Sequence, residues 1–196
     1  MHPIHAPFPL GRFRRTRRSA ALRELTQETR LSPQDLIWPL FLRSGEGERE
    51  PVASMPGVFR LTLDLAVQAA HEARDLGIPA ICLFPYTDPA LKSEDCREAW
   101  NPQNLTNRAI RAIKVAVPEV AVMTDVALDP YNALGHDGLV RDGVILNDES
   151  VAALVRMALV QAEAGADILG PSDMMDGRIG AIRQALEGAG HKDVAI

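Results

Sequence analysis

The feature that most constrains the fold is a repeat of short apolar segments, each followed by a polar loop and an amphipathic helix. The apolar segments are WPLFL (38–42), PAICLF (79–84), VAVMTDV (120–126) and DILGP (167–171). Strands that are apolar throughout, rather than at alternate positions, are typical of parallel sheets that are buried on both faces. Right-handed crossovers must join such strands. The repeat therefore predicts an α/β protein.

The predicted helices follow the strands and complete the repeat. They span 61–78, 104–117, 148–166 and 178–190, and an earlier helix is expected at 19–30. Ser19 and Asp148 are candidate N-caps, because their side-chain oxygens can accept a hydrogen bond from a free backbone N–H group. The segments 43–58, 85–102 and 127–147 are expected to be loops. The final residues, DVAI (193–196), look like the start of one more strand.

Two folds satisfy this pattern, an open doubly wound sheet and a closed (β/α)8 TIM barrel. No G-x-G-x-x-G turn follows the first predicted strand, which makes a dinucleotide-binding fold the less favoured of the two. The long polar loops after the strands resemble the catalytic face of a barrel, and a whole barrel takes about 250 residues. We therefore expect an N-terminal arm at 1–35 and, at 36–196, the first half of a TIM barrel, incomplete at the C-terminus and with about four βα units.

Composition narrows the class of protein. The net charge of −5 argues against a general nucleic-acid binder. Two cysteines are too few for a disulfide framework or a cysteine zinc site, and they favour a cytoplasmic location. No apolar run approaches the roughly 18 residues that a membrane span needs, and the N-terminus has no apolar segment of the kind found in secretory signals. We expect no membrane partner.

The segment RFRRTRR (12–18) is a local exception to this acidic balance, with five arginines. It could be an arm that docks on a neighbouring subunit, a solvated tail, a patch for anions or nucleic acid, or part of an Arg-rich transit peptide.

Candidate site residues lie just after the strands, because ligands of α/β proteins bind at the carboxyl ends of strands. They are Asp125, Asp129, His136, Asp137 and Asp142 after the third predicted strand, and Ser172, Asp173 and Asp176, followed by Arg178, after the fourth. Carboxylates that share one mouth repel each other, and a hard cation such as Mg²⁺ or raised pKa values relieve the repulsion. His136 beside Asp137 could make a mixed site.

Each of these residues also has a purely structural interpretation. Asp129-Pro130 and Asp137-Gly138 are typical turn dipeptides, and Asp173 could cap a helix. Asp125 is different, because it ends an apolar run and should be partly buried. An unpaired buried carboxylate is costly, so we expect Asp125 to have a specific partner and a catalytic or orienting role.

Two segments, MTDVALDPYNALGHDG (123–138) and PSDMMDGRIGAIR (171–183), resemble the δ-aminolevulinic acid dehydratase family, whose members are also called porphobilinogen synthases. RFRRTRRSAALRELTQETRLSPQDLIWPLFL, REPVASMPGVFRLTLD and NPQNLTNRAIRAIK are similar to that family too. The resemblance implies a TIM barrel whose arm wraps a partner subunit in a homo-octamer. It also implies that two molecules of 5-aminolevulinate condense to porphobilinogen in tetrapyrrole (haem and chlorophyll) biosynthesis, through lysines that form Schiff bases with the substrate ketones.

The resemblance implies roles for single residues. Asp125, Ser172 and Asp173 would belong to the catalytic site, where Asp125 would orient a substrate or lysine and Ser172 would line the pocket. Zinc-type members carry three cysteines where this chain has Ala127, Asp129 and Asp137. A three-cysteine catalytic zinc is therefore not expected. Instead, Mg²⁺ is expected as an allosteric or structural ion, with Asp129 and Asp137 at the metal positions.

By the same resemblance, the Schiff-base lysines and the allosteric glutamate of the family would lie beyond Ile196. Lys92, Lys114 and Lys192 are not expected to replace those lysines, so we expect the 196 residues alone to be inactive. The alternatives are another Schiff-base or metal-assisted TIM-barrel aldolase, or an inactive fragment that acts as an interaction module.

Overall fold

In the computed structural model, which describes residues 6–196, the chain divides into two units. The first ends at Ser32 and the second is Pro33–Ile196, so the division falls just before the end predicted for the arm, residue 35.

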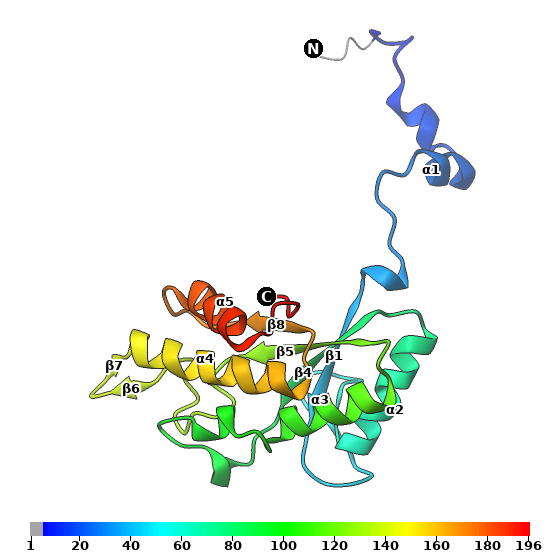
Figure 1. Cartoon of the computed structure of the whole chain (residues 1–196). Coiled ribbons are helices and arrows are strands. Elements are labelled where there is room, and N and C mark those ends of the chain that lie inside the picture. The colour runs from blue at the N-terminus through cyan, green and yellow to red at the C-terminus, as the bar shows by residue number, and fades with distance from the viewer. Residues whose placement is uncertain (1–5) are drawn as a thin grey trace. The chain divides into compact units, whose positions relative to one another are not determined.

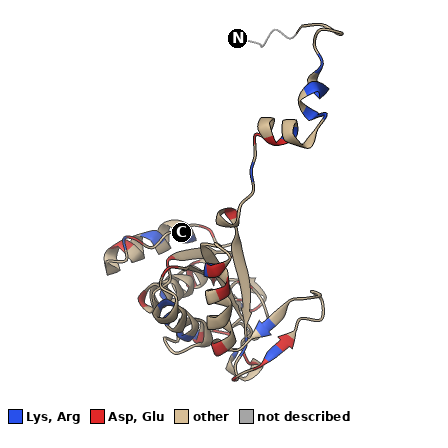
Figure 2. Cartoon of the chain, turned by 90° about the vertical axis from the view of Figure 1, so that its right-hand side faces the viewer, with Lys and Arg blue, Asp and Glu red and all other residues tan. Residues whose placement is uncertain are grey.

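The N-terminal unit consists of a 3-10 helix, η1 (Phe13–Arg17), and a short helix, α1 (Ala20–Thr26). Ser19 caps α1 as predicted, since its hydroxyl oxygen accepts a hydrogen bond from the Leu22 N–H at 3.3 Å. The helix ends before the predicted residue 30, because Gln27 is extended. No residue of η1 or α1 is buried, and Figure 2 shows the arginines as blue bands along this unit. These two helices therefore have no apolar core of their own.

A sheet of six strands forms the centre of the second unit, in the order β2-β3-β1-β4-β5-β8 (Figure 1). The strands are β1 (Ile37–Leu42), β2 (Arg49–Pro51), β3 (Phe59–Leu61), β4 (Ala80–Pro85), β5 (Ala121–Val126) and β8 (Ile168–Pro171). Strands β1, β4, β5 and β8 are parallel neighbours, as the apolar runs predict.

Four helices cover one face of this sheet (Figure 1). They are α2 (Leu63–Asp75), α3 (Leu105–Ala116), α4 (Asn147–Ala164) and α5 (Arg178–Ala189), and each of these four helices packs on the next in chain order. Short 3-10 helices lie between the other elements: η2 (Pro33–Asp35), η3 (Pro89–Leu91) and η4 (Arg97–Trp100). A doubly wound sheet would carry helices on both faces. A (β/α) barrel carries its helices on one face of the sheet only. The arrangement therefore favours the TIM barrel over the doubly wound sheet.

Strand register assigns a face to each side chain. Pro39, Cys82, Met123 and Ile168 are paired in one row across β1, β4, β5 and β8. The next row along the same face contains Phe41, Phe84, Asp125 and Gly170, and the rings of Phe41 and Phe84 stack with centroids 5.6 Å apart. We call this the inner face. Residues at the alternate positions, such as Leu42, Leu83 and Leu169, are fully buried against the helices.

Two pairs of short strands depart from the prediction. Strands β2 and β3 lie at 49–51 and 59–61, where a loop and the first residue of a helix were expected. The 127–147 loop contains a hairpin of β6 (Val140–Arg141) and β7 (Val144–Ile145). Its turn, Asp142-Gly143, has positive φ at both positions, as Asp-Gly turns of hairpins require. These strands are two or three residues long, too short for an apolar pattern to reveal.

The ends of the helices and of the chain complete the comparison. Asp148 does not cap α4, because Leu146 occupies the N-cap position and Asp148 lies within the first turn. There its negative charge still favours the helix N-terminus. The strand predicted at the end of the chain is confirmed in part: Ala195 forms a parallel bridge with Ile168. In residues 6–196, no helix combines the length and apolar character needed to cross a bilayer.

Candidate functional site

The candidate site forms where β5 and β8 end side by side. Asp125 near the end of β5 is paired in register with Gly170 of β8, and Ser172 follows that strand directly. The Ser172 hydroxyl donates a hydrogen bond to Asp125 Oδ1 at 2.6 Å. Asp125 is half-buried and Ser172 is exposed. The partner expected for Asp125 is therefore present, and it comes from the neighbouring strand.

The negative charges of the other predicted carboxylates affect the pKa of Asp125. Burial raises the pKa of Asp125, the Ser172 hydrogen bond opposes that rise, and the negative charges of Asp137 and Asp173 add to it. Burial also raises the pKa of Asp129, with further contributions from Asp137 and Asp125. The carboxylates that follow β5 thus act on one another, as predicted for residues that share one mouth.

Close packing holds the loop that carries Asp137 against the loop that follows β8. A Cβ atom at Gly138 would come within 2.8 Å of Met175 Cε and within 3.1 Å of Ile145 Cγ2. A larger residue at position 138 would require the Met175 side chain to move. The His136 ring contributes to the same turn, because its Nδ1 accepts a hydrogen bond from the Gly138 N–H at 3.0 Å.

These carboxylates do not form a metal-binding group. Across residues 6–196, no three His, Cys, Asp or Glu side chains are grouped so that they could hold an ion. Ala127, which the resemblance places at the first of the three metal positions, is buried in the core and offers no ligand atom. The residues present therefore do not by themselves fit a bound metal.

Asp173 lies deeper than Asp125 and has different partners. Its side chain is completely buried, and its Oδ2 lies 2.9 Å from Arg178 Nε as an ion pair without the alignment of a hydrogen bond. Its Oδ1 accepts a hydrogen bond from the Met175 N–H at 2.6 Å. It does not cap α5, because Gly177 occupies that position. Both oxygens are engaged within its own loop, an arrangement that suits an orienting role.

A second buried polar group lies behind Asp125, and it was not among the residues predicted from the sequence. Gln161 of α4 is fully buried, and its Oε1 accepts a hydrogen bond from the Thr124 hydroxyl at 2.8 Å. Its Nε2 donates to the backbone carbonyl of Asp125 at 3.3 Å. Gln161 thus connects α4 to the end of β5. An amide within the apolar stripe of a helix is the signal that could have revealed it.

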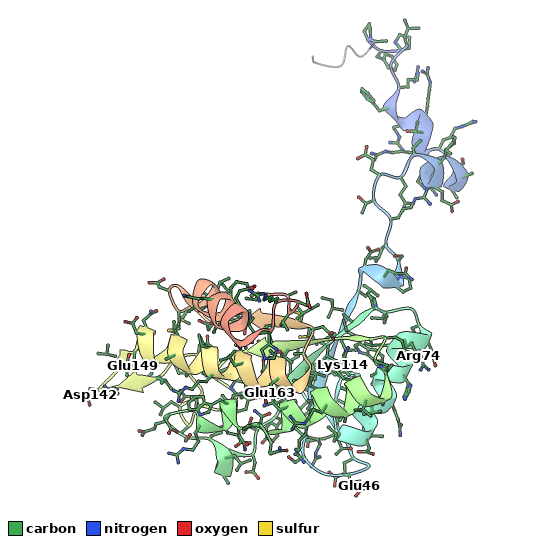
Figure 3. All side chains as sticks on the ribbon, viewed as in Figure 1. Glu46, Arg74, Lys114, Asp142, Glu149 and Glu163 are labelled. Carbon is green, nitrogen blue, oxygen red and sulfur yellow. The ribbon has the colours of Figure 1, made fainter. Side chains whose placement is uncertain are left out.

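None of the three lysines stands beside Asp125 on the inner face. Lys114 forms an ion pair with Asp167 at 3.0 Å, at the start of β8, and Figure 3 shows it on α3. Lys192 is exposed in the turn that follows α5. Lys92 is half-buried, and its positive charge lowers the pKa of Asp129, so it is the lysine whose charge reaches the carboxylates.

A second polar cluster lies at the ends of β1, β3 and β4. Glu50 accepts hydrogen bonds from Arg43 and from Arg60, each at 2.7 Å, and Arg60 stacks over the Tyr86 ring at 4.6 Å. A cavity of about 230 Å³ is lined in part by Arg43, Glu50 and Tyr86. The carboxyl end of the sheet is therefore polar from β1 to β8.

Comparison with known proteins gives consistent results. The family model described as delta-aminolevulinic acid dehydratase matches residues 10–196. A delta-aminolevulinic acid dehydratase from Rhodobacter capsulatus is 64% identical over 98% of this chain and 58% of its own length. One from Bradyrhizobium diazoefficiens is 58% identical over 94% of this chain and 52% of its own.

A solved structure agrees with this chain in fold as well as in sequence. It is a delta-aminolevulinic acid dehydratase from Toxoplasma gondii in complex with porphobilinogen, with a TM-score of 0.90 and 46% identity over 97% of this chain and 53% of that one. The chain thus spans about half the length of the relatives that it matches.

Proposed function

Because the chain belongs to the δ-aminolevulinic acid dehydratase family, we propose that the protein condenses two molecules of 5-aminolevulinate to porphobilinogen in tetrapyrrole biosynthesis. Residues 33–196 supply the first strands of the barrel in which this takes place. The observation that carries the proposal is the Asp125–Ser172 pair at the carboxyl ends of β5 and β8, where a barrel binds its substrate.

The chemistry that this pair can perform is proton transfer and orientation. The condensation moves protons to and from substrate carbon, nitrogen and oxygen atoms, and a carboxyl group whose pKa is raised by burial is suited to that task near neutral pH. The Ser172 hydroxyl holds Asp125 Oδ1 in place and leaves Oδ2 for a substrate. Amines that form Schiff bases with the substrate ketones are also required, and we do not assign that role to Lys92, Lys114 or Lys192.

Turnover of 5-aminolevulinate tests this function. We expect porphobilinogen from the protein expressed from its full reading frame and none from residues 1–196 alone, because its three lysines lie in a loop, on a helix and in a turn rather than on the strands of the inner face. The pyrrole product is measured colorimetrically. A full-frame protein that forms no porphobilinogen contradicts the proposed function, and formation by residues 1–196 contradicts the statement about lysines.

We also propose that the ion of the active protein is Mg²⁺, in an allosteric or structural role. The support is chemical: Asp129 and Asp137 offer hard oxygen atoms, and no thiolate stands at the three positions where zinc-type relatives carry cysteine. Since residues 6–196 group no three ligands, such an ion would need ligands from elsewhere.

Removal of zinc should therefore have little effect. We expect the full-frame protein to keep its activity after treatment with phenanthroline, while a three-cysteine relative treated in parallel loses it. Activity that disappears and returns only on addition of Zn²⁺ would show that the interpretation of Ala127, Asp129 and Asp137 is wrong.

We further propose a homo-octamer whose arm contacts a neighbouring subunit, in the cytoplasm. The support for the arm is that no residue of η1 or α1 is buried within this chain. The support for the compartment is that Cys82 and Cys96 are free thiols.

A further inference from the structure

We propose that Arg178, with Asp173 and Asn147, forms a clamp that positions Ser172 for its hydrogen bond to Asp125. The clamp acts on residues 172–177, the loop between β8 and α5. The inference rests on the proposed function, because the pair that it positions is the catalytic pair proposed above.

The inner part of the clamp closes the loop upon itself. Arg178, the first residue of α5, reaches back with Nε to Asp173 Oδ2 at 2.9 Å and with Nη1 to the Met175 carbonyl at 2.8 Å. Asp173 Oδ1 accepts the Met175 N–H at 2.6 Å. The guanidinium group thus holds the carboxylate next to Ser172 and the middle of the loop at once.

The outer part of the clamp ties the same loop to α4. Asn147, the first residue of α4, accepts a hydrogen bond from the Asp176 N–H at 2.8 Å and donates one to the Asp176 carbonyl at 3.3 Å. Helix α4 is in turn connected to β5 by Gln161, which donates to the Asp125 carbonyl. Helix α4 therefore holds both partners of the Ser172–Asp125 hydrogen bond: it contacts the loop after Ser172 through Asn147 and the backbone of Asp125 through Gln161.

Ser172 depends on this support because its own side chain is exposed. A hydroxyl group at the start of a loop keeps a fixed position only if its backbone does. The side chain of Asp173, by contrast, is fully buried, and Arg178, whose side chain is 27% exposed, directs Nε and Nη1 to the loop. These contacts tie the pair to the loop, which suits it to positioning.

Arginine is specifically suited to this task. Its guanidinium group pairs with the Asp173 carboxylate through Nε while Nη1 donates to the Met175 carbonyl, whereas lysine offers one ammonium group on a flexible stem. Arg178→Lys keeps the positive charge beside Asp173 and removes the second contact. Arg178→Lys therefore distinguishes the positioning of the loop from the effect of a positive charge beside Asp173.

The first experiment is kinetic and uses the full-frame protein. We expect Arg178→Lys to lower kcat about 100-fold, the loss typical of a catalytic group displaced by roughly 1 Å, with KM nearly unchanged. Arg183→Lys is the matched control on the same helix. Arg183 donates to the Val194 and His191 carbonyls and pairs with Glu187, all within α5 and the turn after it, so kcat should not change.

A double-mutant cycle tests whether Arg178 acts through Ser172. In a Ser172→Ala background the hydroxyl that the clamp positions is missing, so Arg178→Lys should cause almost no additional loss of kcat. A loss as large in that background as in the unaltered protein would overturn the proposal, because Arg178 would then act by another route.

Hydrogen exchange of the loop keeps the proposal testable whether or not porphobilinogen is formed. Arg178→Lys should speed amide exchange in residues 172–177, and Arg183→Lys should not. Unchanged exchange in the loop overturns the clamp. If exchange responds as expected but the unaltered full-frame protein is inactive, the clamp stands as a structural device, and the proposed function and the positioning of a catalytic pair both fail.

Discussion

Asp125→Asn is expected to lower turnover of 5-aminolevulinate by the full-frame protein about 100- to 10,000-fold, the usual contribution of a group that transfers protons. Asparagine has nearly the same shape and can still accept the Ser172 hydrogen bond, but it cannot take up or release the proton. The loss should appear in kcat, since the geometry of the pocket is retained.

The same substitution should stabilise the fold at neutral pH. Burial raises the pKa of Asp125 above its usual value of 3.8, so the folded state favours the protonated form. A group of this kind contributes stability that is fully present below the unfolded-state pKa and is lost as pH rises through the folded-state pKa. The Asp125→Asn variant would not carry this loss, because its amide stays neutral, and it would also relieve the repulsion from Asp137 and Asp173.

Asp142→Asn is the matched control for Asp125. Asp142 is exposed at the tip of the β6–β7 hairpin (Figure 3), and its φ of 52° is one that asparagine tolerates. It should change neither turnover nor stability. Denaturant unfolding at pH 7 and pH 4 measures the stability effect, which should be larger at pH 7. Undiminished turnover after Asp125→Asn, or a loss of stability at pH 7, would contradict the assignment.

Asp173→Ala should have the opposite effect on stability, with a loss of about 3–5 kcal/mol. Asp173 is a fully buried carboxylate with a mostly buried partner, so its removal leaves the Arg178 guanidinium group without a counter-charge. The Met175 N–H also loses its acceptor, and an unsatisfied buried donor is costly. Denaturant unfolding again measures the change.

Asp176→Ala is the control for this prediction. Asn147 forms hydrogen bonds with the backbone of Asp176, which alanine keeps, and the Asp176 side chain is exposed. Its effect should stay within about 0.5 kcal/mol. Replacing both partners, as in Asp173→Ala with Arg178→Met, should recover part of the stability, since the unpaired charge is then absent. A loss no larger for Asp173→Ala than for Asp176→Ala would show that the ion pair does not stabilise the loop.

Local patterns in the sequence were enough to predict the main elements. Each apolar run became a parallel strand, and the helices that follow them were predicted to within a few residues, because hydrophobic burial acts on periodic patterns. The half-buried state of Asp125 also follows from its place at the end of such a run. The family could be identified from the segments at 123–138 and 171–183.

Other features depend on contacts between distant parts of the chain. Strands β2 and β3 are paired with each other, and β3 is held by only the last residues of β1, so no local pattern marks them. Asp173 looked like a helix cap, and only the fold showed that Arg178 reaches back to it. Gln161 could not be connected to Asp125 without knowing that α4 packs behind β5.

Periodicity and residue type were therefore enough to predict the order of strands and helices and the family, while the carboxylates predicted at the mouth of the barrel included Asp142 and Asp176, whose side chains are exposed. The tertiary structure decided that helices cover one face only, that Ser172 is the partner of Asp125, and that Asp173 is committed to Arg178. The physical reason is that loop side chains are oriented by hydrogen bonds and ion pairs across neighbouring strands, whose register a linear sequence does not display.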